Sequence, residues 1–226
     1  MQFFKLVGAL AAGSGGQGRK RTADENVDLL AAKSEAFNKG LRGRAFFCVV
    51  NASSSTFTAM AAQKDPTVMI GGTLQLLHSG YRVGKGDTII AESCEYCNSF
   101  LNFFPTVAVI LNVGEDHLDF FKDLKDIEHS FHAFADLVPQ RGYVISNADD
   151  QGAREAVAGL SHPVFTFSLA DRTADCYARD VAFFDGCASF DVMIHGQLYA
   201  HVDLHIPGKH NILNALAAAS AAYVLG

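Results

Sequence analysis

Five short apolar runs constrain the fold of this sequence more than any other feature. Each is apolar at consecutive positions instead of alternating with polar residues, so each predicts a strand that is covered on both faces. Such strands are typical of the parallel sheet of an α/β domain, in which helices pack on both sides. The runs occupy residues 46–51, 67–72, 88–93, 106–113 and 143–147.

A crossover helix is expected between the last two runs. Ile127, Phe131 and Phe134 recur at helical spacing within residues 126–138 and give that segment one apolar face. Strand, helix and strand together predict a parallel βαβ unit. A second, shorter helix at 151–158 leads to a further strand at 164–168.

The pattern changes to period two after residue 170. Asp185-Gly186 and His195-Gly196 have the composition of hairpin turns and separate three alternating runs. The runs lie at 176–183, 188–194 and 199–206, and an alanine-rich helix follows at 211–225. The predicted fold class is therefore α/β, with a doubly wound, mostly parallel sheet and an antiparallel β meander.

A domain boundary is expected near residue 45. Residues 1–45 are rich in glycine and charge, and a capping box from Thr22 to Glu25 predicts one helix there, whereas 46–226 form the α/β domain. Glycines within 13–18 fit the pattern G-x-G-x-x-G, but three basic residues separate them from the helix that would receive a pyrophosphate. This context favours a flexible loop over a dinucleotide site.

Composition excludes several functional classes. The 226 residues carry a net charge of −6, which offers no cationic surface for a nucleic-acid backbone. The apolar stretches are shorter than the ~20 residues that a membrane-spanning helix requires. With only 5 cysteines in a chain large enough to bury a core, no disulfide framework is indicated, so we expect a cytoplasmic protein without nucleic-acid or membrane partners.

Two cysteines form a C-x-x-C motif, Cys94 to Cys97, directly after the run at 88–93. This spacing permits disulfide exchange or half of a zinc site. No second cysteine pair completes four zinc ligands, so the alternative of two semi-buried thiols is favoured. His129 and His132 lie opposite the apolar face of their helix, which indicates a solvated surface.

The segment 112–119 is a stronger candidate for a site. It carries acidic residues and His117, and it follows the most hydrophobic strand at the edge where open α/β sheets bind ligands. Glu92 ends the strand at 88–93 and would be a neighbour if the two strands are adjacent. A carboxylate and an imidazole can hold a hard divalent cation, and a capped, solvated helix start is the alternative.

A third polar cluster begins the last predicted helix. Asn211 is expected to cap free backbone N–H groups in the first turn. An amide at Asn214, inside that turn, is a weak helix former, so its carboxamide is a candidate to face a ligand.

Several segments together resemble the central domain of the Mur ligases. They are residues 89–101, 111–123 and 206–215, supported by 65–73 and 146–150, and the resemblance covers residues 64–226. It is greatest to the members that join L-alanine to UDP-N-acetylmuramate during peptidoglycan precursor synthesis. In these enzymes ATP phosphorylates the carboxylate, and the amine then attacks the acyl phosphate.

The resemblance implies ATP and Mg²⁺ as cofactors and assigns site residues. Glu92 and His117 match the magnesium ligands of the family. His210, Asn211 and Asn214 match the segment that approaches the adenine and ribose of ATP. Magnesium that bridges phosphates neutralises charge during phosphoryl transfer, and side-chain amides can read a purine edge, so the chemistry agrees with both assignments.

The phosphate loop departs from the family pattern. The form Gly-Thr-His-Gly-Lys-Thr-Thr is expected at residues 50–56, but Ser53 replaces a glycine and Ser54 replaces the lysine. A serine supplies no cation, and its side chain obstructs the backbone amides that cradle phosphates. Ser55 and Thr56 retain hydroxyls that could reach magnesium. The segment 60–64 is also about two helical turns shorter than in the family.

The resemblance also implies limits on activity. We expect residues 1–45 to be a degenerate N-terminal segment and the C-terminal ligase domain to be absent, so that no interdomain cleft can exclude water from an acyl phosphate. The chain alone is then expected to be inactive or nearly so. The alternative is a non-catalytic module with the same fold that binds a nucleotide or a partner.

Overall fold

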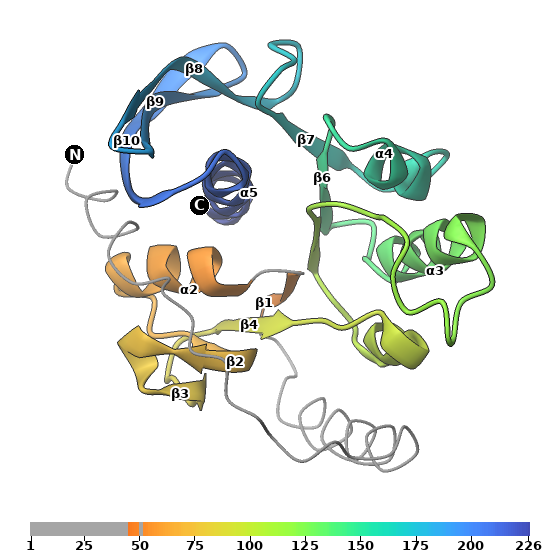
Figure 1. Cartoon of the computed structure of the whole chain (residues 1–226). Coiled ribbons are helices and arrows are strands. Elements are labelled where there is room, and N and C mark those ends of the chain that lie inside the picture. The colour runs from red at the N-terminus through yellow and green to blue at the C-terminus, as the bar shows by residue number, and fades with distance from the viewer. Residues whose placement is uncertain (1–44, 50–51) are drawn as a thin grey trace.

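The computed structural model describes residues 45–49, by their backbone, and 52–226 (Figure 1). The expected N-terminal helix and the glycine-rich pattern at 13–18 lie outside the described residues. The described strands form a single ten-stranded sheet in the order β10-β9-β8-β7-β6-β5-β1-β4-β2-β3. The strands are β1 (Ala45–Val49), β2 (Thr67–Leu74), β3 (Ser79–Arg82), β4 (Thr88–Glu92), β5 (Val107–Ile110), β6 (Tyr143–Asn147), β7 (Val164–Ser168), β8 (Cys176–Phe184), β9 (Cys187–Ile194) and β10 (Gln197–Pro207).

The centre of the sheet is parallel. β2, β4, β1, β5, β6 and β7 pair in parallel, and β8 joins them in parallel through β7. The carboxyl ends of β2, β4, β1, β5, β6 and β7 therefore lie at one edge of the sheet, which we call the carboxyl edge, and β8 begins there, because its first residues pair with the last residues of β7. β1 lies between β4 and β5, so these two strands are not neighbours. Glu92 was expected beside His117 only if the strands that precede them were adjacent, and this condition is not met.

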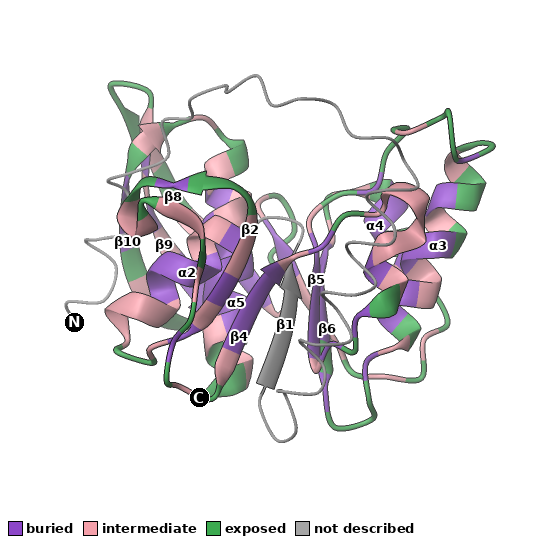
Figure 2. Ribbon diagram, turned by 90° about the horizontal axis from the view of Figure 1, so that it is seen from below, coloured by how far each residue is buried: buried purple, intermediate pink, exposed green. Residues whose placement is uncertain are grey.

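Helices cover both faces of this sheet (Figures 1 and 2). They are α2 (Ala52–Ala61), α3 (Leu124–Asp136), α4 (Gln151–Val157) and α5 (His210–Leu225), with the 3-10 helices η1 (Gln75–Leu77) and η2 (Tyr96–Asn102). One buried core includes residues of α2 and α5, and the other includes residues of η2, α3 and α4. The continuous apolar runs form strands because side chains on both faces of the sheet are buried.

Aspartates begin two of the helices. Asp123 accepts a hydrogen bond from the N–H of Asp126 at 3.0 Å and caps α3. Asp150 caps α4 by accepting from the N–H of Ala153 at 2.8 Å, and its same oxygen accepts from the N–H of Val113 at 3.0 Å. The second contact ties the loop after β5 to α4, so one carboxylate fixes both a helix start and a loop of the carboxyl edge.

The antiparallel meander of β8, β9 and β10 curves around α5 (Figure 1). Asp185-Gly186 and His195-Gly196 both have positive φ values, the conformation of tight hairpin turns, as their composition predicts. The register of β8 on β9 shifts between Arg179 and Ala182, and this β-bulge inserts one extra residue into β8.

The predicted fold class is confirmed, and four local elements differ from the prediction. The edge strand β3 and the 3-10 helices η1 and η2 were not predicted. α2 begins at Ala52, so most of the segment expected as a phosphate loop at 50–56 is helical. Within the described part of the chain, no helix combines the length and the apolarity needed to span a bilayer.

Candidate metal and nucleotide site

Two loops meet at the carboxyl edge of the sheet. One follows β4 and contains η2, and the other follows β5 and leads to α3. Their side chains are joined directly, because the hydroxyl of Tyr96 donates a hydrogen bond to Oδ2 of Asp119 at 2.9 Å. This is the edge at which open α/β sheets bind their ligands.

Glu95, Asp116 and His117 form the candidate metal site. Each offers one ligand atom, and these atoms lie within 4.8 Å of one another; the described residues contain no other such group of three. Nε2 of His117 is 3.6 Å from Oε1 of Glu95, and Nδ1 is 3.8 Å from Oδ1 of Asp116. Carboxylate oxygens with one imidazole are a donor set that a hard divalent cation accepts, so the residues fit Mg²⁺.

The position of His117 is fixed by its backbone and by a neighbouring ring. Its φ of 52° lies in the left-handed region, and its N–H donates to Oδ1 of Asp116 at 2.7 Å. The Tyr96 ring lies against the imidazole, with 4.7 Å between the ring centroids. The hydrogen bond to Asp119 raises the pKa of Tyr96 to about 12, so this tyrosine remains a protonated donor at neutral pH.

The η2 loop holds Glu95 through an irregular turn. Cys97 and Asn98 have φ values of 53° and 56°, a conformation that costs non-glycine residues energy and often occurs at functional sites. The side chain of Asn98 accepts a hydrogen bond from the hydroxyl of Ser130 in α3. The hydroxyl of Ser99 lies 2.9 Å from the carbonyl oxygen of Cys94. These contacts support the turn from both sides.

The structure groups Glu95, and not Glu92, with His117. Glu92 ends β4, and its Oε2 accepts a hydrogen bond from the N–H of Gly71 in β2 at 3.1 Å. β1 separates β4 from β5, so the strand that carries Glu92 is not beside the strand that precedes His117. Glu95 lies three residues later, in the η2 loop, which crosses to the β5 side. The sequence signal for Glu95 was present in the C-E-Y-C segment but was interpreted only for its thiols.

The residues of the predicted phosphate loop lie in the first turns of α2. Thr56 is fully buried, and its hydroxyl donates to the carbonyl oxygen of Ala52 at 2.8 Å, so it is engaged within its own helix. Ser55 is also buried and lines a cavity between α2 and α5. Of the four predicted residues, Ser53 and Ser54 lie nearest to the amino end of α2.

The amino end of α5 carries the third predicted cluster. Its N-cap is Lys209, without a side-chain capping bond, so the expected capping role of Asn211 is wrong. Instead, Nδ2 of Asn211 donates back to the carbonyl oxygen of Pro207 at 2.8 Å. Nδ2 of Asn214 donates to Oδ1 of Asn211 at 3.2 Å, and His210 is the first residue of the helix. The two amides therefore form a pair on the first turn of α5.

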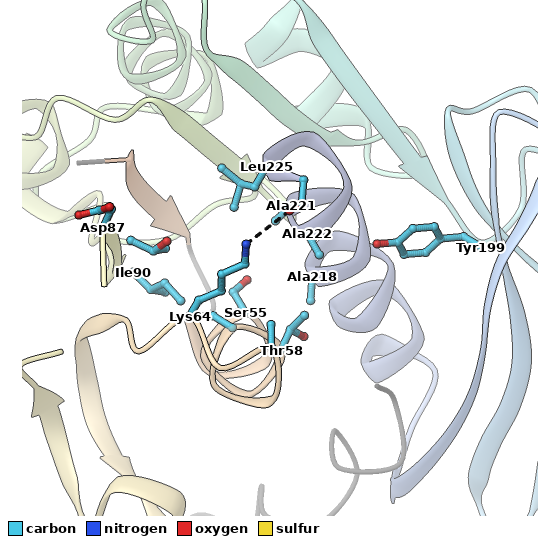
Figure 3. A pocket seen from close by; sticks show the side chains of 14 residues that line it. Ser55, Thr58, Lys64, Asp87, Ile90, Tyr199, Ala218, Ala221, Ala222 and Leu225 are labelled. Carbon is cyan, nitrogen blue, oxygen red and sulfur yellow. Dashed lines mark hydrogen bonds between the residues drawn. The ribbon is translucent and has the colours of Figure 1, made fainter. Parts of the chain in front are cut away.

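The described residues line two cavities, one at each edge of the sheet. A cavity of about 170 Å³ is lined by Glu95, Asp116 and residues of the β5 loop, and so adjoins the metal group. A larger one of about 370 Å³ lies between α2 and α5, where Lys64, Asp87 and Leu225 line it (Figure 3). Asp87 precedes β4, so the larger cavity lies at the amino edge, opposite the metal group.

The residues that line the larger cavity show in which direction α2 and α5 run. Its lining includes Ala59 and Ala62 at the carboxyl end of α2 and Ala222 and Leu225 at the carboxyl end of α5. Since these ends lie at the amino edge, the amino ends of both helices point to the carboxyl edge. Helix amino ends present free N–H groups and partial positive charge, so the carboxyl edge is electrostatically suited to an anion.

The four cysteines whose side chains are described are free thiols, two of them in the C-x-x-C motif. Although Cys94 is exposed as a residue, desolvation of its sulfur raises the pKa of the thiol. A thiol with a raised pKa is a poor nucleophile at neutral pH. Nδ1 of His132 donates a hydrogen bond to the carbonyl oxygen of Ala156 at 2.9 Å, while His129 is exposed.

Comparison with protein families gives one match. Residues 73–222 match the family described as the Mur ligase middle domain. The match includes β4, the η2 loop, the β5 loop and the amino end of α5, and therefore all three parts of the candidate site that follow α2.

Curated relatives agree with this match. Over 163 residues the chain is 44% identical to a UDP-N-acetylmuramate–L-alanine ligase of Caldanaerobacter subterraneus subsp. tengcongensis, covering 72% of the chain and 35% of the relative. Over 211 residues it is 36% identical to the enzyme of the same name from Clostridium perfringens, covering 89% and 46%. The chain thus spans less than half the length of these relatives.

Solved structures share the fold. A UDP-N-acetylmuramate:L-alanyl-gamma-D-glutamyl-meso-diaminopimelate ligase from Neisseria meningitides superposes with a TM-score of 0.74 at 23% identity, covering 93% of this chain and 73% of that one. A UDP-N-acetylmuramate-alanine ligase from Thermotoga maritima gives 0.68 at 24% identity, covering 91% and 50%.

Proposed function

The chain belongs to the Mur ligase family, and on that premise we propose that it supplies the magnesium- and ATP-binding part of a cytoplasmic ligase that joins L-alanine to UDP-N-acetylmuramate. The substrates follow the printed names of the curated relatives. The observation that carries the proposal is the group of Glu95, Asp116 and His117 at the carboxyl edge of the sheet.

Each part of the carboxyl edge has a role in this proposal. Glu95 and His117 hold the metal ion, with Asp116 beside them and Tyr96 keeping the imidazole in place. When bound, Mg²⁺ supplies positive charge to the phosphates of ATP. The amino end of α2, with Ser53 and Ser54, directs backbone dipole toward the same edge.

The amino end of α5 is proposed to bind the nucleoside. The first five residues of this helix include His210, Asn211 and Asn214. Amide groups can both donate hydrogen bonds to a purine edge and accept them from it. Ser54 offers no cation, so neutralisation of the phosphates rests on the metal ion and the helix dipoles.

The proposed reaction proceeds in two steps. A carboxylate oxygen of UDP-N-acetylmuramate attacks the γ-phosphorus of ATP, the bond to the β,γ-bridging oxygen breaks, and ADP leaves. The amine of L-alanine then attacks the acyl carbon, the carbon–oxygen bond to the phosphate breaks, inorganic phosphate leaves with that oxygen, and the proton that the nitrogen loses passes to the departing phosphate or to water. Both steps transfer charge onto phosphate oxygens, which is the charge that the metal site would stabilise.

ATP binding with and without Mg²⁺, measured by calorimetry, tests this proposal. We expect the chain to bind ATP only when Mg²⁺ is present, and we expect His117→Ala to abolish this Mg²⁺-dependent binding. His129→Ala, at an exposed position of α3, is the matched control and should bind as the wild type does. Failure of the wild-type chain to bind ATP under any condition would contradict the proposal.

A second candidate is a non-catalytic nucleotide-binding module, and the serine in place of the phosphate-loop lysine favours it. Phosphate release with ATP, UDP-N-acetylmuramate and L-alanine distinguishes the two. Binding of ATP without phosphate release supports the module, and ordinary turnover refutes the expectation that this chain alone is inactive.

A further inference from the structure

Phe183 and Phe184 form an exposed aromatic pair at the end of β8. They are 45% and 69% exposed, in a meander whose other phenylalanine, Phe190, is fully buried. β8 runs parallel to β7, and its first residues pair with the last residues of β7, so β8 begins at the carboxyl edge and extends beyond it. The proposed function assigns no role to either ring.

The hairpin that carries the pair contacts the amino end of α5. The N–H of Gly208 donates to the carbonyl oxygen of Gly186 at 3.3 Å, and Pro207 pairs with Cys187 across β10 and β9. Gly208 is two residues before His210, the first residue of the helix. The turn at Asp185-Gly186 is therefore held beside the segment proposed to bind the nucleoside.

The β-bulge in β8 decides which ring faces α5. Before the bulge, Ala178 pairs with Val192, and both are buried in the core beneath the helix. If the alternation continued unbroken, Phe183 would point to the outer face together with Arg179. The bulge inserts one residue, with Asp180 at a φ of 54°, and thereby reverses the alternation.

After the bulge, Phe183 pairs with Ala188 and shares its face of the sheet. Ala188 is 2% exposed and belongs to the core cluster that includes Ile212 of α5. Phe183 therefore lies on the concave face of the meander, toward α5. Phe184 pairs with Cys187 and lies on the opposite, outer face.

We infer that Phe183 is the apolar contact for the purine base of the nucleotide, beside the amide pair of Asn211 and Asn214. The bulge turns the half-exposed Phe183 ring to the face that α5 occupies, so the ring is available to a ligand held at the amino end of that helix. Aromatic side chains stack on the π-face of a base, while the neighbouring amides address its edge. This inference rests on the proposed function.

The free energy of a base–aromatic stack predicts how much ATP affinity is lost when the ring is removed. We expect Phe183→Ala to weaken binding of Mg²⁺-ATP by about five- to a hundredfold, the range for loss of one base–aromatic stack. Binding of inorganic tripolyphosphate with Mg²⁺ should not change, because tripolyphosphate has no base. Phe184→Ala removes the same ring from the outer face and is the matched control, so it should bind both ligands as the wild type does.

A direct probe is available because the chain contains no tryptophan. In Phe183→Trp the emission should shift or quench on addition of Mg²⁺-ATP and not of tripolyphosphate, whereas Phe184→Trp should respond to neither. Far-ultraviolet circular dichroism confirms that each variant is folded.

The outcomes separate the inference from the proposed function. If the wild type binds ATP and Phe183→Ala behaves like Phe184→Ala, the inference is overturned while the proposed function stands. Equal wild-type affinity for ATP and tripolyphosphate also overturns it, because no base is then recognised. If the wild type binds no ATP, both fail.

Discussion

Tyr96 links the two loops of the candidate metal site, and its ionisation reports on that link. Because the pKa of Tyr96 is raised from 10 to about 12, the hydrogen bond to Asp119 contributes stability that is fully present below pH 10 and is lost as the pH rises toward 12. We expect the tyrosinate absorbance of Tyr96→Phe to differ from that of the wild type only near pH 12.

Asp119→Asn provides the control for this titration. It removes the carboxylate that raises the pKa, so Tyr96 should titrate closer to pH 10. If Tyr96 titrates at the same pH with and without the Asp119 carboxylate, the described link between the loops is absent.

The sequence predicted some site residues and missed others. His117 could be identified because it follows a strongly apolar strand. Glu95 could not be preferred over Glu92 because the choice depends on which strand lies between β4 and β5, and strand order is a long-range property. The φ of 52° at His117 likewise follows from packing and not from local composition.

Among the elements, α3 depends most clearly on one buried ring. Phe134 has no exposed surface and stacks on Phe100 of η2 with 4.7 Å between ring centroids. We expect Phe134→Ala to lower the free energy of unfolding by about 3–5 kcal/mol, measured by urea denaturation. His129→Ala, on the exposed side of the same helix, should change it by less than about 0.5 kcal/mol. Equal effects of the two changes would show that α3 does not pack as described.

The meander carries a charge network that makes its stability depend on pH. Arg179, Asp191 and His201 pair directly across β8, β9 and β10, and Nδ1 of His201 lies 2.8 Å from Oδ1 of Asp191. The hydrogen bond to Asp191 raises the pKa of His201. This contribution is fully present below about pH 6.5, the unperturbed value, and is lost as the pH rises through the raised pKa.

We therefore expect the free energy of unfolding to fall less between mildly acidic and mildly alkaline pH in His201→Gln than in the wild type. His129→Gln removes one exposed histidine elsewhere and should keep the wild-type dependence on pH. An identical pH dependence in His201→Gln and the wild type would contradict the described pair.

Periodicity predicted most of the elements, and the exceptions have physical causes. The central strands and α3 are recognisable because their burial is continuous or strictly helical. Residues 50–56 were expected as a loop because the family pattern has its phosphate loop there, but α2 begins at Ala52 and contact with α5 stabilises the helix. The bulge at Asp180 leaves no local signal, because either register of Phe183 satisfies the alternating pattern.

At the scale of the whole molecule, the candidate site groups gather at the carboxyl edge. The metal group and the amino ends of α2 and α5 lie there, and the hairpin that carries Phe183 contacts the segment that leads into α5, while the larger apolar cavity lies at the amino edge. In the proposed function, a bound cation and the helix amino ends together neutralise the phosphates, so the central claim is the metal site formed by Glu95 and His117.

Mn²⁺ binding in the presence of ATP, followed by electron paramagnetic resonance, tests that claim most directly. Glu95→Gln and Glu92→Gln remove one charge each from carboxylates three residues apart. We predict that Glu95→Gln weakens Mn²⁺ binding by about tenfold or more, while Glu92→Gln has the smaller effect. Wild-type binding by Glu95→Gln, together with loss of binding by Glu92→Gln, would contradict this prediction.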